Sequence, residues 1–546
     1  MSNPTEKPNE KPKKPNEPPR IKLADRLKKI QRFVDANQKK ILLTLITAFL
    51  LVILGSAAFI FYTQSQVKKA LEPSVSETKI AALANIREVN LVTELGAIPN
   101  DDKDDSAAFQ QALNLAKEEP IHLIIPEGEY LSKPSGNLEA TEIKGLHIEG
   151  QGTVNIKPVN PMINPPEYYF MRINMAAENL GVEIENIVID GSLSPQDLYF
   201  TMQTPADVHK TPLQRGIFIN GAKDLAVHNT TFQHMYGGYT IHATNYENVN
   251  IKDITINDVG GDDITDSFGM ALYFGGHAGN AVINVDNVQA QGKVSERNPS
   301  YTAWIGIVLE NGTIQAKDDD DWKKDQNTTV NVTNSSFMDY ETTFHIESMA
   351  GNVYWNVDNV KTRAKDYLIA AGINGEMKER TNRLTMEMTP WGRNNIIHGL
   401  YYTEKEAEDN VSGVNEFSMY NSEITYLTLP DTKPISVATS YADSVRATYT
   451  RTTFNDVPAK LVANASATFI KSQINLAENS KETAASLLKG SFSKPEEQFI
   501  KFDSTKINKF PTAKKATKFG YPKLLEPTGY TPPPIDKSLP PAELKE

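Results

Sequence analysis

The sequence predicts an all-β solenoid of stacked rungs, because one short phrase recurs from Ile184 to Lys471. Each copy has an apolar residue, any residue, an Asn or Asp that we call the anchor, and then a β-favouring run. Neighbouring anchors are 24 residues apart between positions 229 and 253 and 25 apart between 334 and 359, with longer intervals elsewhere. Such a period, interrupted by insertions, is typical of rungs with loops at some corners. The anchors are Asn186, Asn229, Asp253, Asn287, Asn334, Asn359 and Asn421, with fainter copies at Arg451 and Lys471.

The anchors are predicted to be structural rather than catalytic. Asn and Asp tolerate the left-handed backbone of a tight bend, and their side chains can satisfy backbone donors there.

The absence of Cys means that packing and ladder hydrogen bonds must hold the fold, because neither disulfides nor thiolate metal sites are available.

The N-terminal part of the chain predicts a membrane anchor. Residues 1–40 form a disordered, basic tail that ends in a short amphipathic stretch, and residues 41–62 contain no charge over 22 positions. That length is enough to cross a bilayer, and the cationic flank on its N-terminal side places the tail in the cytoplasm. Residues 63–94 are expected to form a stalk, so that everything after about residue 63 lies in the periplasm or outside the cell.

The charge distribution argues against a nucleic-acid partner. Residues 1–40 carry 12 Lys and Arg against 5 Asp and Glu, so the rest of the chain is more acidic than its formal net charge of -12 suggests. Binding along a phosphate backbone needs a basic face. The body of the protein suits a neutral ligand, or an anionic one held by local cations or by a metal ion.

The segment from Leu95 to Ser132 carries a family resemblance. It contains Gly-Ala followed closely by Asp104-Asp105, a helix that Ser106 can cap, with Phe109, Ala112, Leu113 and Ala116 on one face, and a strand that leads into Pro-x-Gly-x-Tyr. This segment resembles the entrance of the pectate-lyase-like superfamily of right-handed parallel β-helices. The resemblance, which covers about residues 95–471, implies a single-stranded right-handed parallel β-helix over residues 95–475, with the helix as its N-terminal cap. Residues 476–546 are expected to form a C-terminal helix and a Pro-rich tail.

A second set of strands precedes the anchors. These strands are GIFIN, GYTIH, GMALY, GIVLE and TFHIE, and alignment of their ends places Asn220, His242, Tyr273, Glu310 and Glu347 in one row. Since side chains alternate across a strand, the row faces outward together with the residues two positions earlier, among them His345. The long insertions fall at the two edges of this sheet, which predicts a groove suited to a linear polysaccharide.

The predicted groove contains acid and base groups. Glu310 and Glu347 lie one rung apart with His345 beside them, an arrangement that can supply an acid and base pair near neutral pH. Two carboxylates can hydrolyse a glycosidic bond. A lyase or C5-epimerase acting on a uronate instead needs a base, a carboxylate neutraliser and a proton donor, roles that His242, Tyr273, His345 and Arg215 could fill.

Further candidates lie in the insertions. Asp262, Asp263 and Asp266, on a Gly-flanked loop, could bind Ca²⁺, although ordinary solvation of the loop explains them as well. No other cofactor is indicated. His277 and Arg297 are possible sugar contacts, beside Asn220 and Arg215.

The reaction itself has no motif. The chain lacks the Asn-Thr-Asp and Gly-His-Gly set of polygalacturonase-like hydrolases, the Asp-Pro-His-Asp motif of alginate epimerases and the Arg-x-Pro-x-x-Arg pattern of pectate lyases. The sequence favours a membrane-anchored, extracytoplasmic enzyme of polysaccharide metabolism in the cell envelope, with lyase or epimerase chemistry ahead of hydrolysis. The alternative is a non-catalytic β-helix that binds glycan or scaffolds an envelope or exopolysaccharide assembly complex. A homotrimer is left open.

Overall fold

A computed structural model describes residue 28 and, with gaps, residues 79–509 of the chain. The described ranges are 79–133, 138–159, 168–192, 214–235, 239–260, 269–276, 279–292, 303–310, 327–347, 349, 351–371, 373, 375–389, 396–400, 416–427, 446–457, 466–476 and 500–509. The chain divides into two units, Met1–Val75 and Ser76–Glu546, and all 31 described strands belong to the second.

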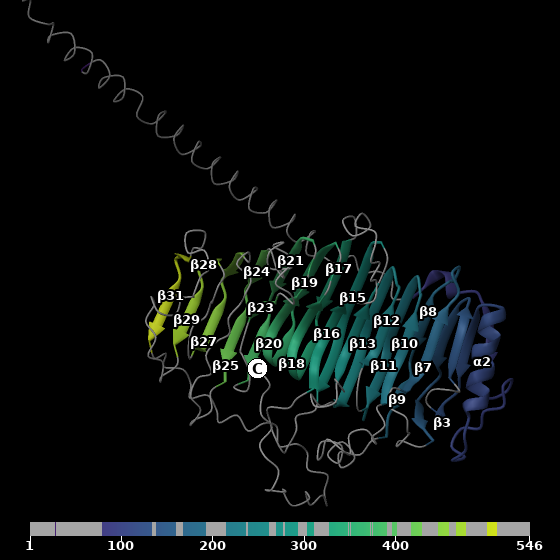
Figure 1. The fold of residues 1–546 in the computed structure, drawn as a ribbon. Helices are drawn as coiled ribbons and strands as arrows, with labels where there is room; N and C mark the ends of the chain where they lie inside the picture. The colour runs from purple at the N-terminus through teal and green to yellow at the C-terminus, as the bar shows by residue number, and fades with distance from the viewer. Residues whose placement is uncertain are drawn as a thin grey trace, which may run out of the picture. The chain divides into compact units, whose positions relative to one another are not determined.

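The second unit is a parallel β-helix, as predicted. Its strands pair only in parallel within the described ranges, and the partner of each strand is the equivalent strand of the next rung. Figure 1 shows these strands side by side, from the end that carries α2 (Ser106–Glu118) to the end that carries β31. The pairings fall into three stacks, which we call sheets 1, 2 and 3 in the order in which the chain enters them on each turn.

Sheet 1 contains β1 (Arg87–Asn90), β2 (Ile121–Ile125), β5 (Leu146–Gly150), β8 (Val182–Glu185), the first parts of β11 (Asp224–Gln233), β13 (Asn248–Val259) and β15 (Ala281–Gly292), then β17 (Asn327–Thr333), β19 (Asn352–Asp358), β21 (Met377–Asn382), β24 (Glu416–Tyr420), β26 (Arg446–Thr450), β28 (Ser466–Ile470) and β30 (Ile500–Asp503). Sheet 2 contains β3 (Gly128–Ser132), β6 (Val154–Pro158), β9 (Val188–Asp190), the second parts of β11, β13 and β15, the first parts of β18 (Ser336–Glu347) and β20 (Lys361–Ala371), then β22 (Thr385–Met388), β25 (Glu423–Tyr426), β27 (Thr453–Val457), β29 (Gln473–Leu476) and β31 (Lys506–Lys509). Sheet 3 contains β4 (Glu139–Ile143), β7 (Tyr168–Met175), β10 (Gln214–Asn220), β12 (Tyr239–Thr244), β14 (Met270–Gly275), β16 (Ala303–Glu310), the second parts of β18 and β20, and β23 (Ile397–Leu400).

The anchors form the corner between sheets 1 and 2. Every predicted anchor has a positive φ, from 48° at Asn229 to 61° at Asn186, which is the left-handed conformation that Asn and Asp tolerate best. Their side chains also bond from rung to rung, since Asn359 Nδ2 donates to Asn334 Oδ1 at 2.9 Å. Two corner residues that the repeat did not reveal, Arg383 and Ser504, have φ values of 56° and 51°. The structural role predicted for the anchors is confirmed.

The entrance motif builds the first rungs. The carboxylate of Asp105 accepts the backbone N–H groups of Ile98 and Leu131, at 2.9 and 3.2 Å, and so ties the start of α2 to β3. Ser106 does not cap the helix as expected: it is the first helical residue, and its Oγ accepts the N–H of Lys133 at 2.6 Å. Phe109 is buried with the other apolar residues on its face of the helix, in the core of the β-helix.

The glycine of the motif Pro-x-Gly-x-Tyr is required by close packing. Gly128 has a φ of 150°, and a Cβ at this position would lie 2.4 Å from Cβ of Pro99. The tyrosine of the motif, Tyr130, is fully buried, and its hydroxyl donates to the carbonyl of Pro126 at 2.8 Å. The motif therefore closes one turn onto the next.

The β-helix extends beyond both of its predicted boundaries, residues 95 and 475. β1, inside the expected stalk, already pairs with β2, and Leu83 and Val89 are buried. At the other end β30 and β31 add a rung beyond residue 475, turning at Ser504 in place of an Asn or Asp. Among the described residues no helix is both long and apolar enough to cross a membrane; the predicted span at residues 41–62 lies outside them.

An acidic side chain, Glu379, lies in the core at a position where an apolar one is expected. Glu379 is 2% exposed and lies in register between Trp355 and Phe417, which are both core residues. Burial raises the pKa of Glu379 to about 8, although hydrogen bonds from Thr381 and Tyr367 favour its charged form. Its Oε2 has no hydrogen-bond partner among the described residues, so the protonated acid fits this position better than the carboxylate.

Replacement of an anchor should cost stability through its backbone conformation. We expect Asn334→Ala to lower the free energy of unfolding by about 1–2 kcal/mol, because Ala is strained at a φ of 50°, whereas Asn334→Gly should lose less. Thermal unfolding followed by circular dichroism measures the effect. Asn356→Ala is the matched control, since Asn334 and Asn356 each donate a side-chain hydrogen bond to the preceding rung, to Asp286 and Asn331, but Asn356 lies within a strand. Equal losses at positions 334 and 356 would contradict the corner argument.

Glu379 should make stability depend on pH. Its folded pKa, about 8, lies above the value of 4.5 for an exposed glutamate, so the stabilisation is complete below about pH 4.5 and is lost as the pH rises toward 8. The slope for one such group reaches about 1.4 kcal/mol per pH unit. We expect Glu379→Gln to flatten this part of the profile in denaturant titrations at pH 5 to 8, whereas Glu416→Gln, at an exposed site, should leave it unchanged. An unchanged profile in the Glu379 variant would show that the group is ionised when buried.

Candidate functional site

The outer face of sheet 3 carries the predicted ladder of polar groups. Pairing of β7, β10, β12, β14, β16 and β18 places two outward rows two residues apart. The row that we call the histidine row consists of Arg172, Phe218, His242, Tyr273, Val308 and His345. The row that we call the glutamate row consists of Asn174, Asn220, Thr244, Gly275, Glu310 and Glu347. The alternate residues Ile219, Ile241, Leu272, Leu309 and Ile346 are at most 1% exposed and fill the core.

The sequence aligned Asn220, His242, Tyr273, Glu310 and Glu347 in one row. Two of the four neighbouring pairs in this alignment are correct and two are wrong. His242 pairs with Tyr273, and Glu310 pairs with Glu347, as expected. Asn220 instead pairs with Thr244, and Tyr273 pairs with Val308. A slip of two residues keeps every side chain on the same face, so the alternation of polar and apolar residues cannot detect it. β12 and β14 each continue for two residues beyond the end that the alignment assumed.

His242 lies at the centre of an aromatic cluster. The rings of Phe218, Tyr239 and Tyr273 lie 4.7, 4.7 and 4.4 Å from its imidazole. Burial and the nearby cations Arg215 and Arg172 lower the pKa of His242 to about 3, while burial raises the pKa of Tyr169 to about 12. Both groups are therefore neutral near pH 7.

The protons of this pair can be assigned from the network. The Tyr169 hydroxyl lies 2.5 Å from Nδ1 of His242, and Nη1 of Arg215 donates to the same hydroxyl at 3.5 Å. With both groups neutral, the hydroxyl donates to Nδ1, and the imidazole proton is then on Nε2. His242 is thus arranged to donate a hydrogen bond from Nε2 rather than to accept a proton there.

Two arginines give the cluster a positive charge. The guanidinium of Arg215 lies 5.5 Å from the ring centre of Tyr169 and 5.1 Å from that of Tyr239. Arg172 lies 5.2 Å from the ring centre of Phe218. Nε of Arg215 is buried and has no acceptor among the described residues. A carboxylate ligand could supply the acceptor that this group lacks.

Tyr273 reaches diagonally across the sheet to Glu310. Its hydroxyl donates to Oε2 of Glu310 at 2.7 Å, although the two residues are not opposite each other. Gly275, directly opposite Glu310, makes this possible, because a Cβ there would lie only 2.7 Å from Cε1 of Tyr273. Burial and the bond to Glu310 raise the pKa of Tyr273, so the phenol keeps its proton.

Glu347 and His345 form a second acid and base pair on β18. Nε2 of His345 lies 3.2 Å from Oε2 of Glu347, within ion-pair distance but without hydrogen-bond geometry, and the Trp304 ring meets the imidazole edge-on at 6.0 Å. Glu310 and Glu347 are in register on adjacent strands. The structure thus brings together the two carboxylates, His345 and Tyr273, with His242 and Arg215 on the neighbouring rungs.

The other predicted site residues are not part of this arrangement. Asn220 belongs to a hydrogen-bond ladder, because its side chain donates to Asn174 and accepts from Thr244 and Asn245. Asp262, Asp263, Asp266, His277 and Arg297 lie outside the described residues, so the Ca²⁺ site and these sugar contacts stay predictions. The insertions expected to form the groove also lie outside them.

Three residues around His242 were not predicted from the sequence: Tyr169, Arg172 and Tyr239. β7 contains Met-Arg-Ile-Asn one residue before its end, and β10 ends in Ile-Phe-Ile-Asn, so this shared pattern could have extended the ladder by one strand. Tyr239 precedes His242 on a recognised strand, but only its contacts show that its ring joins the cluster.

Comparison with known proteins leaves the reaction open. No protein-family model matches the chain, and no curated protein matches it either. Among solved structures it is similar to a family 28 exopolygalacturonase of Yersinia enterocolitica, at 11% identity and a TM-score of 0.39, over 78% of this chain and 79% of that one. It is similar also to the surface protein and adhesin PfbA of Streptococcus pneumoniae, at 11% identity and a TM-score of 0.39, over 77% and 100%. A tailspike protein of E. coli bacteriophage HK620, in complex with a pentasaccharide, has 8% identity and a TM-score of 0.34, over 76% and 78%. Scores this low support no inference about substrate or reaction.

Proposed function

We propose that the chain is an enzyme that modifies a uronate-containing polysaccharide on the outer face of sheet 3. The observation that supports this most is the protonated Tyr273 held against Glu310, one strand away from the His242–Tyr169–Arg215 network. Proton donors, carboxylates and a cation with an unused N–H thus lie on neighbouring strands. An aromatic surface suits the apolar faces of sugar rings, and rungs in register suit a linear chain.

The groups support proton abstraction at C5 of a uronate. In this scheme Arg215, with the Nε2–H of His242, neutralises the uronate carboxylate, which makes the C5 proton more acidic, and Glu310, which Tyr273 holds beside His242, takes that proton. In β-elimination the electron pair forms the C4–C5 double bond and the C4–O bond breaks, with Tyr273 giving its proton to the leaving oxygen. In epimerisation the C5 carbanion is instead protonated from the opposite face.

Hydrolysis is the second candidate, because Glu310 and Glu347 are in register on adjacent strands. One carboxyl group would protonate the glycosidic oxygen, and the other would act as nucleophile or activate water. A glycan-binding scaffold without catalysis is the third candidate. An assay of the products formed from uronate polymers, described below, distinguishes the three.

We also propose that a single span at residues 41–62 anchors the enzyme, with the β-helix outside the cytoplasm. The uncharged stretch of 22 residues and its cationic N-terminal flank support this orientation. Protease treatment of intact cells and of inverted vesicles tests it: the β-helix should be accessible only in intact cells or spheroplasts.

The reaction can be identified with the full-length chain in detergent and a panel of uronate polymers, with and without Ca²⁺. A lyase produces unsaturated ends that absorb ultraviolet light, an epimerase exchanges the C5 proton for deuterium without cleavage, and a hydrolase releases reducing ends alone. We expect one of the first two. Binding without any of these changes would contradict the enzyme and support the scaffold.

Variants of the Tyr273–Glu310 pair test the site. We expect Tyr273→Phe and Glu310→Gln each to lower kcat/KM by about 100-fold or more, since each removes a group that handles a proton. Gly275→Ala should have a similar effect by displacing the Tyr273 ring. Tyr354→Phe and Glu416→Gln, both on sheet 1, are matched controls that should keep full activity. Full activity in the Tyr273 and Glu310 variants would exclude this site.

A further inference from the structure

A second cluster of titratable groups lies on the outer face of sheet 1, away from the proposed catalytic residues. Successive strands contribute polar residues at alternate positions: His122 on β2, His147 and Glu149 on β5, Glu183 and Glu185 on β8, and His228 on β11. Pairing places His122, His147 and Glu183 in one row and Glu149, Glu185 and His228 in the next. We call these six residues the His147 cluster.

The centre of the cluster is buried although it faces outward. His147, Glu183, Glu185 and His228 are between 2% and 7% exposed. The segment before β1 covers them: the N–H of Ile80 donates to Oε2 of Glu183 at 3.0 Å, and Nζ of Lys79 donates to Oε1 of Glu185 at 3.2 Å. Two carboxylates buried side by side are costly unless positive charge balances them, and the Lys79 side chain is 66% exposed.

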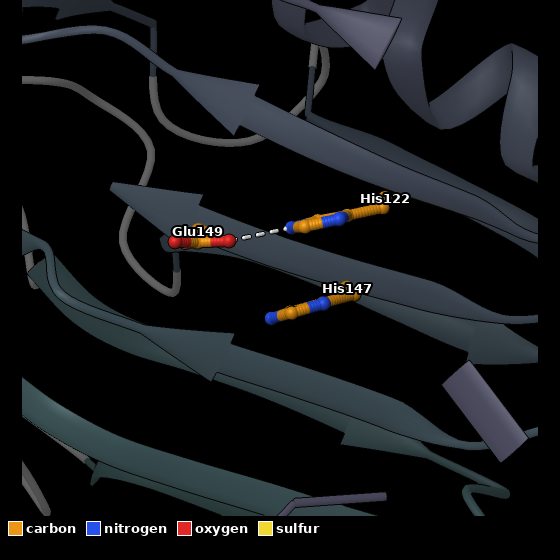
Figure 2. Close-up of side chains that lie close together, drawn as sticks. All are labelled: His122, His147 and Glu149. Carbon is orange, nitrogen blue, oxygen red and sulfur yellow. Dashed lines mark ion pairs between the residues drawn. The ribbon is translucent and has the colours of Figure 1, made fainter. Parts of the chain in front are cut away.

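Two overlapping groups of three ligand atoms could hold a metal ion, and both use His147. The first comprises His122, His147 and Glu149, which Figure 2 shows on adjacent strands. Its two imidazoles are stacked, with ring centres 3.9 Å apart and planes 4° apart. The lone pair of an imidazole nitrogen lies in the ring plane, so an ion between parallel rings would be far out of both planes. This group therefore does not fit one ion.

The second group comprises Nε2 of His147 with Oε1 of Glu183 and Oε1 of Glu185. The nitrogen lies 2.9 Å from the Glu185 oxygen and 3.8 Å from the Glu183 oxygen. Ligands bound tetrahedrally at about 2.0–2.1 Å lie roughly 3.3 Å from one another, and the two distances fall on either side of this value. Small side-chain movements would therefore suffice to coordinate an ion.

His228 is placed to orient both carboxylates. Its Nε2 lies 3.0 Å from Oε1 of Glu183, and its Nδ1 lies 3.5 Å from Oε2 of Glu185. Partners of this kind hold metal ligands in place and are part of most such sites. One nitrogen and two carboxylate oxygens, with no thiolate in the chain, suit Zn²⁺ better than Ca²⁺, which takes oxygen ligands alone.

We propose that His147, Glu183 and Glu185 bind one Zn²⁺ ion that joins β5 to β8 beneath the segment at Lys79 and Ile80. The ion balances the two buried carboxylates and takes the place of Lys79 beside Glu185. The exposed side chain of Lys79 can leave without disturbing the fold. Three protein ligands leave the fourth tetrahedral position to water, and the site is independent of the chemistry proposed for sheet 3.

The test uses the full-length chain, stripped with a chelator and dialysed against Zn²⁺. We expect one Zn²⁺ per chain by elemental analysis, a higher thermal unfolding temperature with the metal than without it, and a visible absorption band of tetrahedral type when Co²⁺ replaces Zn²⁺. Failure of the folded wild-type chain to retain Zn²⁺ would overturn the proposal.

Variants distinguish the two groups. Glu185→Gln, which keeps the shape of the side chain, should lower Zn²⁺ affinity at least 10-fold, and Lys79→Ala should raise it by removing a competing cation. Glu149→Gln, in the rejected group, is the matched control and should bind as the parent does. Loss of Zn²⁺ in the Glu149 variant but not in the Glu185 variant would overturn the assignment. Circular dichroism of each variant confirms that it is folded, so a lost metal is not mistaken for a lost fold.

Discussion

The structure depends on one backbone constraint, a corner residue in the left-handed conformation that repeats on each described rung from Asn186 to Ser504. A positive φ at this corner turns the chain from sheet 1 into sheet 2, and the following strand then pairs with its equivalent one rung away. Because this corner has the same length on these rungs, the strands of sheet 2 that follow the anchors begin in register with one another. The anchors at Asn334 and Asn359 add a side-chain hydrogen bond to the same stack.

This constraint explains why the sequence predicts sheets 1 and 2 better than sheet 3. The anchors mark one corner of each rung, and their residue type is dictated by the backbone. The ladder strands of sheet 3 lack such a marker, since long insertions separate them and the only signal is an alternation with a period of two. The two-residue slip at Asn220 and at Tyr273 follows directly. Corners at Arg383 and Ser504 were overlooked because a stack of rungs can hold a residue that would not choose this conformation alone.

The candidate site could be predicted as a set of residue types on one face, but not as a network. The sequence places His242, Tyr273, Glu310, Glu347 and His345 on the outer face of one sheet, and the structure bears this out. It could not show that Tyr273 bonds to Glu310 across Gly275, because that contact depends on a missing side chain opposite Glu310. Nor could it show that Tyr169, on a strand outside the recognised set, fixes the tautomer of His242. Such diagonal contacts depend on side-chain length, which a row alignment ignores.

Burial changes the protonation of each titratable cluster differently, although all of these clusters belong to the same β-helix. Inside the barrel Glu379 has no counter-charge, and its pKa rises because only the neutral acid is tolerated. On sheet 3 the arginines add to burial and keep His242 neutral, whereas burial and the bond to Glu310 keep the proton on Tyr273. On sheet 1 the two buried carboxylates Glu183 and Glu185 meet histidines and Lys79, and nitrogen and oxygen ligands converge there with an excess of negative charge. The same outward row position thus favours proton donation on one sheet and metal coordination on another, according to the sign of the charge that is buried with it.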